Sequence, residues 1–355
     1  MRASRKPLLA WSRGWFFVTL LLLSLACKLF DDMPDLGISR EQRSPLPQDA
    51  GLSRSQPYPH DRLLETGIWE VRILDVVRGG EAWDLLAPAN SNNEAPPEGW
   101  EYVMVKVWIQ CTAGDDDEHF FGAWLTGDLG VEYVGFDAVP PGPQLERRLD
   151  TGEVSEGWEV YLLPENEGNL ILVIRSLGES GDTPNPPYYL AVDPGAHILV
   201  DLALDEIAPT TAGTVLTRSL ELGQMATTEN WQIKVEQVIW DDEAWELLLD
   251  ANQFNDPPAQ DKRYLLVSVW ARYIGVEEGP VRAYTYQFSL LGSDQILYNP
   301  PALVEPEPEL NVSLYPGGEA VGWVALEVDR FAERPLLVFE PSYSDEETRY
   351  FALQP

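Results

Sequence analysis

The chain has 355 residues, of which 45% are hydrophobic, and a formal net charge of −34. This composition excludes a wholly disordered chain, and the acidic surface excludes nucleic-acid binding because it would repel phosphates. With two cysteines, three histidines and no Cys-x-x-Cys or His-Glu-x-x-His motif, the sequence indicates no metal or redox cofactor.

Residues 1–27 predict a secretory signal or a membrane anchor. A basic start precedes the apolar run 15–26, which is shorter than the ~20 residues that span a bilayer. The small residues Ser24 and Ala26 precede Cys27, which resembles the lipobox of bacterial lipoproteins and implies lipidation of Cys27, although that pattern has Leu where Ser24 stands. Ordinary cleavage and an uncleaved anchor are the alternatives. All three place the rest of the chain outside the cytoplasmic membrane.

Residues 28–65 predict a disordered tether. They are rich in Pro, Ser, Asp, Arg and Gln and show no sustained helical or strand period. Such a segment would hold the folded part of the protein away from the membrane.

The remaining chain contains an internal repeat. Residues 69–110 align without a gap with residues 231–272, and fifteen of these 42 positions are identical. After an offset of three further residues, the match resumes at Gly152 with Gly317 and at Gly157 with Gly322. We therefore expect two copies of one domain, copy one (66–204) and copy two (216–355), joined by the linker 205–215. The paired markers of the repeat are Trp69/Trp231, Trp83/Trp245, Asn90/Asn252, Asn93/Asn255, Trp108/Trp270 and Trp158/Trp323.

The sequence of each copy predicts a series of short strands. Alternating or continuous apolar runs, separated by Gly- and Pro-rich turns, predict seven or so strands in each copy. This pattern is typical of an all-β sandwich. The clearest runs are 69–77, 102–110, 157–163, 169–174 and 188–192 in copy one, and 231–239, 264–272, 322–328, 335–340 and 350–353 in copy two.

A helical insertion is expected between the first two long strands of each copy. Acidic residues at its start favour one or two helical turns, and Trp83, Leu85 and Leu86 would face the end of the sandwich. Asn90 and Asn93 would then hydrogen-bond nearby backbone groups. The same arrangement is expected of Trp245, Leu247, Leu248, Asn252 and Asn255.

Three motifs together resemble a family of extracellular immunoglobulin-like domains of the immunoprotective extracellular type. They are the Asn-x-x-Asn-x-x-Pro loop, the Tyr-led strand that follows, and the later Gly-x-x-x-x-Gly-Trp, and each occurs in both copies. Members commonly follow a lipoprotein signal in bacteria and archaea. The resemblance implies two tandem immunoglobulin-like β-sandwiches and carries over no catalytic residue. Copy one departs from the pattern around 178–187, so either 189–192 or 198–202 could form its last strand.

Several residues are candidates for catalysis or metal binding. Asp150-Thr151-Gly152 matches the aspartic-protease triplet, but copy two lacks a second aspartate, so we interpret it as a turn. Cys111 is expected to be a buried, idle thiol. A run of acidic residues could bind Ca²⁺ but lacks an EF-hand spacing, so a solvated loop is the favoured interpretation. These metal candidates are Asp115, Asp116, Asp117 and Glu118.

The tryptophans could form a sugar-binding platform. The four pairs of strand and helix tryptophans are expected to build cores instead, with Trp108 and Trp270 buried in the most regular strands. The unpaired Trp100, Trp124 and Trp240 are better candidates for exposure.

These observations predict a non-enzymatic, membrane-tethered binding or structural protein of the cell envelope, without a cofactor. Its expected partners are the membrane, through the N-terminal lipid or anchor, and an unknown envelope protein or glycan. Two alternatives stay open, a secreted hydrolase that uses paired carboxylates and a Ca²⁺-dependent adhesion module.

Overall fold

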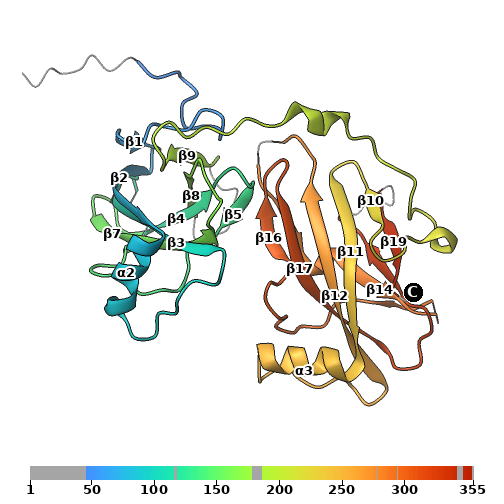
Figure 1. Cartoon of the computed structure of the whole chain (residues 1–355). Coiled ribbons are helices and arrows are strands. Elements are labelled where there is room, and N and C mark those ends of the chain that lie inside the picture. Colours follow the sequence, from blue (N-terminus) through green and yellow to red (C-terminus); the bar gives the residue numbers. More distant parts are fainter. Residues whose placement is uncertain are drawn as a thin grey trace, which may run out of the picture. The chain divides into compact units, whose positions relative to one another are not determined.

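Antiparallel strands and two α-helices make up the part of the chain that the computed structural model describes, residues 45–115, 118–177, 186–277, 279–293, 295–341 and 347–353. Residues from Asp49 onward form one unit by their contacts. Within the described ranges, no helix has the length and apolar character needed to cross a bilayer. Figure 1 shows the order of the elements along the chain.

Two sheets of copy one share a core. The first has the order β1-β2-β3-β7, and the second contains β5-β4-β8-β9 with β6 paired to β4. Their bounds are β1 Leu64–Glu65, β2 Trp69–Arg78, β3 Trp100–Cys111, β4 His119–Thr126, β5 Val131–Tyr133, β6 Arg148–Leu149, β7 Val154–Pro164, β8 Ile171–Leu177 and β9 Tyr188–Ala191. The last strand of copy one is therefore β9, at the first of the two expected segments (189–192), and not at 198–202.

Copy two repeats this order of strands. One sheet has the order β10-β11-β12-β17 and another β15-β14-β18-β19, while β13 and β16 join the second sheet of copy one through β5. The bounds are β10 Met225–Thr227, β11 Trp231–Trp240, β12 Lys262–Tyr273, β13 Val281–Tyr284, β14 Phe288–Leu291, β15 Leu297–Tyr298, β16 Asn311–Leu314, β17 Glu319–Asp329, β18 Leu336–Phe339 and β19 Arg349–Ala352. Short 3-10 helices lie at Leu202–Glu206, Leu216–Arg218 and Thr285–Gln287.

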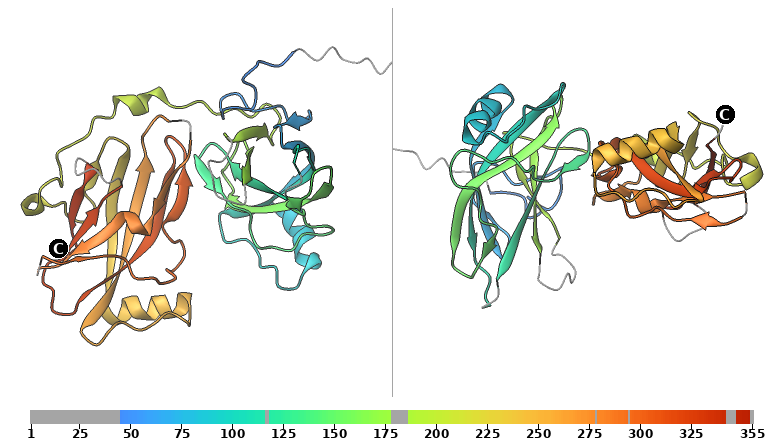
Figure 2. Two further views of the ribbon diagram at one scale, coloured as in Figure 1. Left: turned by 180° about the vertical axis from the view of Figure 1, so that it is seen from behind. Right: turned by 90° about the horizontal axis from the view of Figure 1, so that it is seen from below.

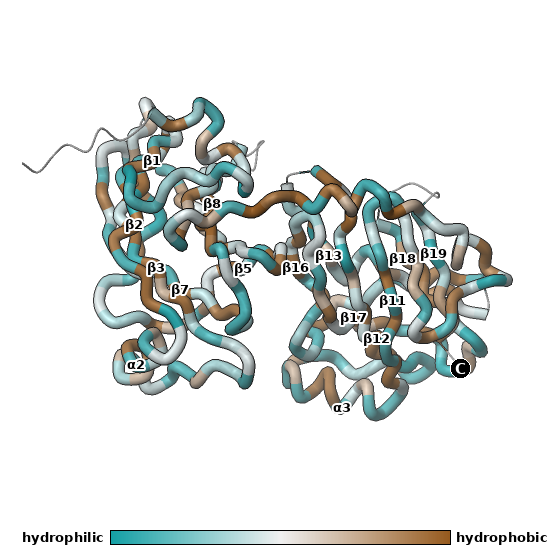
Figure 3. The backbone as a smooth tube through the Cα atoms, turned by 45° about the horizontal axis from the view of Figure 1, so that its top comes forward, coloured by the Kyte–Doolittle hydropathy of each residue, from teal (hydrophilic) through white to brown (hydrophobic). Residues whose placement is uncertain are grey.

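The alternation of the long strands places one face of each in the core. In β3, Val103, Val105 and Val107 are buried with Phe121 and Leu172 of the second sheet. Trp69 is 1% exposed, and its ring meets the ring of Phe121 edge-on at 5.4 Å. Figure 3 shows the hydrophobic stretches along β3 and β12. Burial of apolar side chains between the two sheets is therefore the main source of stability in each copy.

Two helices are longer than the one or two turns that the sequence predicts. Helix α2 spans Gly80–Ala89 and α3 spans Asp241–Ala251. In α2, Ala82 and Leu86 lie four residues apart and are buried with Met104 on the outer face of β3. This i, i+4 pair extends the helix because each turn adds apolar contact with the sheet. Helix α3 lies where β11 ends and β12 begins (Figure 1), and α2 occupies the matching end of its sheet in the views of Figure 2.

Trp108 and Trp270 are not in the cores where the sequence places them. Both are half-buried on the outer face of their strands, because their neighbours in the alternation point inward. The ring of Trp270 lies under the ammonium of Lys234 at 5.3 Å, and its Nε1 donates to Glu319 Oε2 at 3.3 Å. Trp69 and Trp231 do fill the cores, whereas Trp83, Trp158, Trp245 and Trp323 are partly buried beside the helices.

The end of the tether differs from the expected boundary at residue 65. Residues 49–65 pack on copy one, because their backbone and one guanidinium find partners there. The N–H of Tyr58 donates to the carbonyl of Tyr189 at 2.7 Å, and buried Arg54 donates to the carbonyl of Gly127 at 2.7 Å. Arg54 also lies 4.2 Å above the ring of Tyr315. The folded unit therefore begins at Asp49, 17 residues before the expected start at residue 66.

Candidate functional site

A repeated asparagine fixes a surface loop in each copy. The Nδ2 of Asn93 donates to the carbonyls of Leu86 at 2.8 Å and Val139 at 2.9 Å, while its Oδ1 accepts from the N–H of Val139 at 2.9 Å. Asn255 makes the same three bonds to Leu248 and Val304, at 2.7, 2.9 and 3.0 Å. Each asparagine thus joins the end of its helix to the loop that follows β5 or β15.

A glycine in β7 and β17 lets the same loop cross the strand closely. A Cβ on Gly157 would lie 2.4 Å from the backbone nitrogen of Leu145, and one on Gly322 would lie 2.5 Å from that of Leu310. Such distances exclude a larger residue unless the backbone moves. In copy two, the first glycine of the motif is Gly317, which lies in a turn with a φ of +85°. The Gly-x-x-x-x-Gly-Trp pattern is therefore a framework for the loop.

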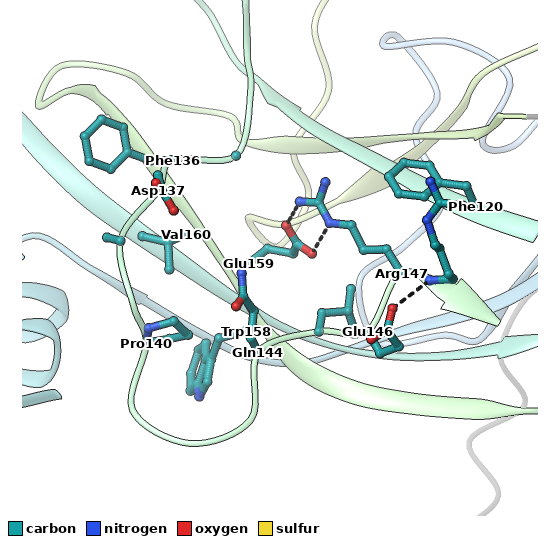
Figure 4. Close-up of a pocket in the computed structure, with 14 residues that line it drawn as sticks. Phe120, Phe136, Asp137, Pro140, Gln144, Glu146, Arg147, Trp158, Glu159 and Val160 are labelled. Atoms are coloured by element: carbon teal, nitrogen blue, oxygen red, sulfur yellow. Dashed lines mark hydrogen bonds and ion pairs between the residues drawn. The ribbon is translucent and has the colours of Figure 1, made fainter. Parts of the chain in front are cut away.

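Loop 134–147 of copy one borders an open cavity of about 390 Å³ between itself, β4 and β7. The loop is attached on several sides, since Phe136 N–H donates to Val160 O at 2.7 Å and Phe121 N–H donates to Arg147 O at 2.8 Å. Figure 4 shows its charged and aromatic lining. Its charged and aromatic lining residues are Phe120, Phe136, Asp137, Glu146, Arg147, Arg148, Trp158 and Glu159.

An ion pair lies in the middle of this cavity. The Nε of Arg147 donates to Glu159 Oε1 at 2.9 Å, and its Nη2 contacts Glu159 Oε2, so the pair is bidentate. The side chain of Glu159 is 5% exposed and that of Arg147 is 30% exposed. Burial raises the pKa of the Glu159 carboxyl above its ordinary value, and the guanidinium opposes this rise. Arg147 is therefore held in one orientation by a buried partner.

Aromatic rings stand on either side of the ion pair. Figure 4 shows Phe136 on one side and Phe120 on the other, with Trp158 next to Gln144. Phe136 is 44% exposed, and the guanidinium of Arg148 lies 5.6 Å from the ring of Phe120. The cavity therefore offers apolar faces together with charged groups.

Copy two has a smaller cavity at the equivalent place, of about 110 Å³ under the loop near 301–311. Its lining includes Arg282, Tyr284, Tyr286 and Glu305. Thr285 Oγ1 donates to Glu305 Oε1 at 2.9 Å, and burial raises the pKa of that carboxyl. The loop framework is shared by the two copies, but the side chains that line the cavities differ.

The predicted site residues do not gather at these cavities. Among the acidic candidates, Asp115 is 2.7 Å from Nε2 of His119, and Glu118 accepts from Arg148 at 3.2 Å. Asp116 and Asp117 lie outside the described residues. No group of three or more His, Cys, Asp or Glu side chains that could hold a metal ion occurs in the described ranges.

Other predicted residues have structural positions. Cys111 is fully buried with a free thiol, as expected, whereas Cys27 lies outside the described residues. The Asp150 triplet forms the expected turn, in which Glu153 N–H donates to Asp150 O at 3.0 Å. Trp100 is exposed, but Trp124 and Trp240 are half-buried beneath the guanidinium groups of Arg175 and Arg263.

Sequence reasoning missed the Arg147–Glu159 pair, although the repeat contains a signal for it. With the offset that aligns Gly157 and Gly322, Arg147 matches Val312 and Glu159 matches Val324. Val324 belongs to the hydrophobic core of copy two, and Val312 is partly buried and packs against that core. An ion pair that replaces an apolar pair at matched positions marks a departure of copy one from the shared scaffold.

Comparison with known proteins gives distant structural likenesses. No family model and no curated protein matches the chain. A candidate lipoprotein, ycdA from Bacillus subtilis subsp. subtilis strain 168, is 14% identical with a TM-score of 0.29 over 36% of this chain and 37% of that one. The yjhA protein from Bacillus subtilis is 13% identical with a TM-score of 0.28 over 38% of this chain and 99% of that one. The matched segment therefore spans little more than a third of ycdA.

Proposed function

We propose that this protein is a non-enzymatic, envelope-exposed lipoprotein that presents two immunoglobulin-like β-sandwiches, copy one (66–204) and copy two (216–355), to a ligand outside the cytoplasmic membrane. The N-terminal pattern that ends at Cys27 supports the anchor. The two sheets that share a core in each copy support the sandwich architecture.

The observation that supports a binding role is that the two copies share the residues that hold the loop but differ in the side chains that line the cavity under it. Asn93 and Asn255, and Gly157 and Gly322, hold the same loop in the same way in both copies. The side chains under that loop differ, with an ion pair in one copy and valines in the other. A rigid frame with changed loop chemistry is a common design of binding modules.

The arrangement of the carboxylates favours binding over hydrolysis. A carboxylate-dependent hydrolase needs one carboxyl free to give its proton to the substrate. Glu159 is the cavity carboxyl with a raised pKa, but both of its oxygens face Arg147. We therefore assign it a positioning role.

The anchor is tested by fractionating cells that express the full-length protein, with mass spectrometry of its N-terminus. We expect the native protein in the membrane fraction with a modified Cys27 as its first residue, and Cys27→Ser should be released or remain unprocessed. Ser24→Leu supplies the lipobox leucine and should keep or increase processing. Retention of residues 1–26, or an unmodified Cys27 at the N-terminus, would contradict the lipid anchor.

A further inference from the structure

We infer that the cavity of copy one is a binding site for a neutral saccharide, recognised by the Arg147 guanidinium, the carboxylates beside it and the aromatic rings that flank them. This inference rests on the proposed binding function and adds its ligand class. Four features of the cavity support it.

The first feature is a preorganised hydrogen-bond donor. Glu159 engages Nε and Nη2 of Arg147, whereas Nη1 makes no hydrogen bond to any residue in the described ranges. A guanidinium has five N–H donors, so the two on Nη1 can serve a ligand. Because Glu159 already fixes the side chain, little rotamer freedom would be lost on binding. Sugar hydroxyl oxygens are suitable acceptors for these donors.

The second feature is a set of acceptors at the rim. Asp137 is exposed and has no protein partner within the described ranges, and Glu146 uses Oε1 to accept from Arg148 N–H at 3.1 Å. Glu146 Oε2 is left for a ligand. Carboxylates accept from hydroxyls in charge-assisted bonds. A ligand that both donates and accepts through hydroxyls would match this mixture.

The third feature is the pair of aromatic faces. Phe120 and Phe136 line opposite sides of the ion pair, and Trp158 adds a third ring (Figure 4). The face of an aromatic ring carries partial negative charge and attracts the polarised C–H groups of a sugar ring. The volume of about 390 Å³ lies within the ~300–1,000 Å³ of small-molecule sites.

The fourth feature is the charge balance, which selects a neutral ligand over an anion. Two cationic residues, Arg147 and Arg148, are outnumbered by Asp137, Glu146 and Glu159, so the lining carries 2 − 3 = −1. The whole chain carries −34. A phosphate or uronate would therefore be repelled by both the cavity and the surrounding field.

Copy two supplies the matched control. In copy two, Val312 and Val324 occupy the positions of Arg147 and Glu159; Val324 is buried in the core, and Val312 packs against that core. Replacing a buried ion pair by apolar residues is often neutral or stabilising. The double variant Arg147→Val/Glu159→Val should therefore fold without the Arg147 donor and its Glu159 partner, while the net charge of the lining stays unchanged.

The experiment titrates the full-length protein with maltotriose, mannotriose and chitotriose, and with glucuronate and inorganic phosphate as anionic probes. Saturation-transfer NMR and calorimetry give the affinity, and circular dichroism confirms folding of each variant. We expect at least one neutral trisaccharide to bind, with Kd raised about ten-fold or more by the double variant. Phe136→Ala should weaken binding, whereas Tyr286→Ala, which alters an exposed ring of the second cavity, should not.

Three results would overturn the inference. They are no binding of any neutral trisaccharide at about 10 mM, undiminished binding by the folded double variant, and stronger binding of glucuronate or phosphate than of the sugars. Each leaves the proposed surface role intact, because that role is tested separately by the processing and location of the Cys27 terminus.

Discussion

Truncation of Asn255 should separate the loop of copy two from its helix. Asn255 is 9% exposed and makes three hydrogen bonds, to the carbonyls of Leu248 and Val304 and from the N–H of Val304. At about 0.5–1.5 kcal/mol for each bond, Asn255→Ala should lower the free energy of unfolding of copy two by about 3 kcal/mol. Asn255→Asp should cost at least as much, because a carboxylate would then face two carbonyl oxygens.

Two variants in copy one should show a smaller loss of stability and serve as comparisons. Asn93→Ala removes the same three bonds from a more exposed site, so we expect a loss of about 1–2 kcal/mol. Asn92→Ala changes an exposed neighbour, and its effect should stay within about 0.5 kcal/mol.

Two assays check the prediction. Urea unfolding, followed by fluorescence and circular dichroism, gives the change in unfolding free energy. Hydrogen exchange at the amide of Val304 reports the local event, because this N–H loses its acceptor in Asn255→Ala. If Asn255→Ala were no more destabilising than Asn92→Ala and left exchange at Val304 unchanged, the side chain would not hold the loop.

Three further predictions concern packing and pH. Trp270→Ala should cost only about 1 kcal/mol in denaturant unfolding, against about 3–5 kcal/mol for buried Trp231→Ala; equal losses would contradict the outward orientation. Gly322→Ala should lower stability by about 2–3 kcal/mol, because its Cβ would meet the backbone of Leu310, while Gly279→Ala, with open space, should be neutral. Burial raises the pKa of Glu159, so the folded protein binds this proton more tightly than the unfolded chain does. Its contribution should make stability rise as pH falls through the folded-state pKa of Glu159 toward the ordinary Glu value of about 4.3, and the rise should be smaller in Glu159→Gln; an identical pH profile of the two proteins would contradict this.

The sequence by itself determined the strands and the repeat. Alternation at 69–77 and 231–239, and the apolar runs at 102–110 and 264–272, are local patterns, and the strands β2, β11, β3 and β12 contain them. The positions of Asn93 and Asn255 were also readable, because an asparagine that follows a helix commonly bonds nearby backbone. These features depend on side-chain period and turn chemistry within a few residues of the chain.

The tertiary structure decided which face of each strand is enclosed. Trp108 and Trp270 stand on the outer face because period-2 alternation gives two faces and does not say which one a second sheet covers. The length of α2 and α3 depended on apolar contact with an outer strand face that sequence period does not reveal.

The candidate site was also decided by the tertiary structure. Arg147 comes from a loop and Glu159 from β7, twelve residues later, and only the crossing of that loop over Gly157 brings the two groups together. Loop 134–147 has no period from which this crossing could be read. A buried charge needs its partner within hydrogen-bond reach, so the chemistry of the cavity follows from the path of the loop, which is fixed by contacts distant in sequence.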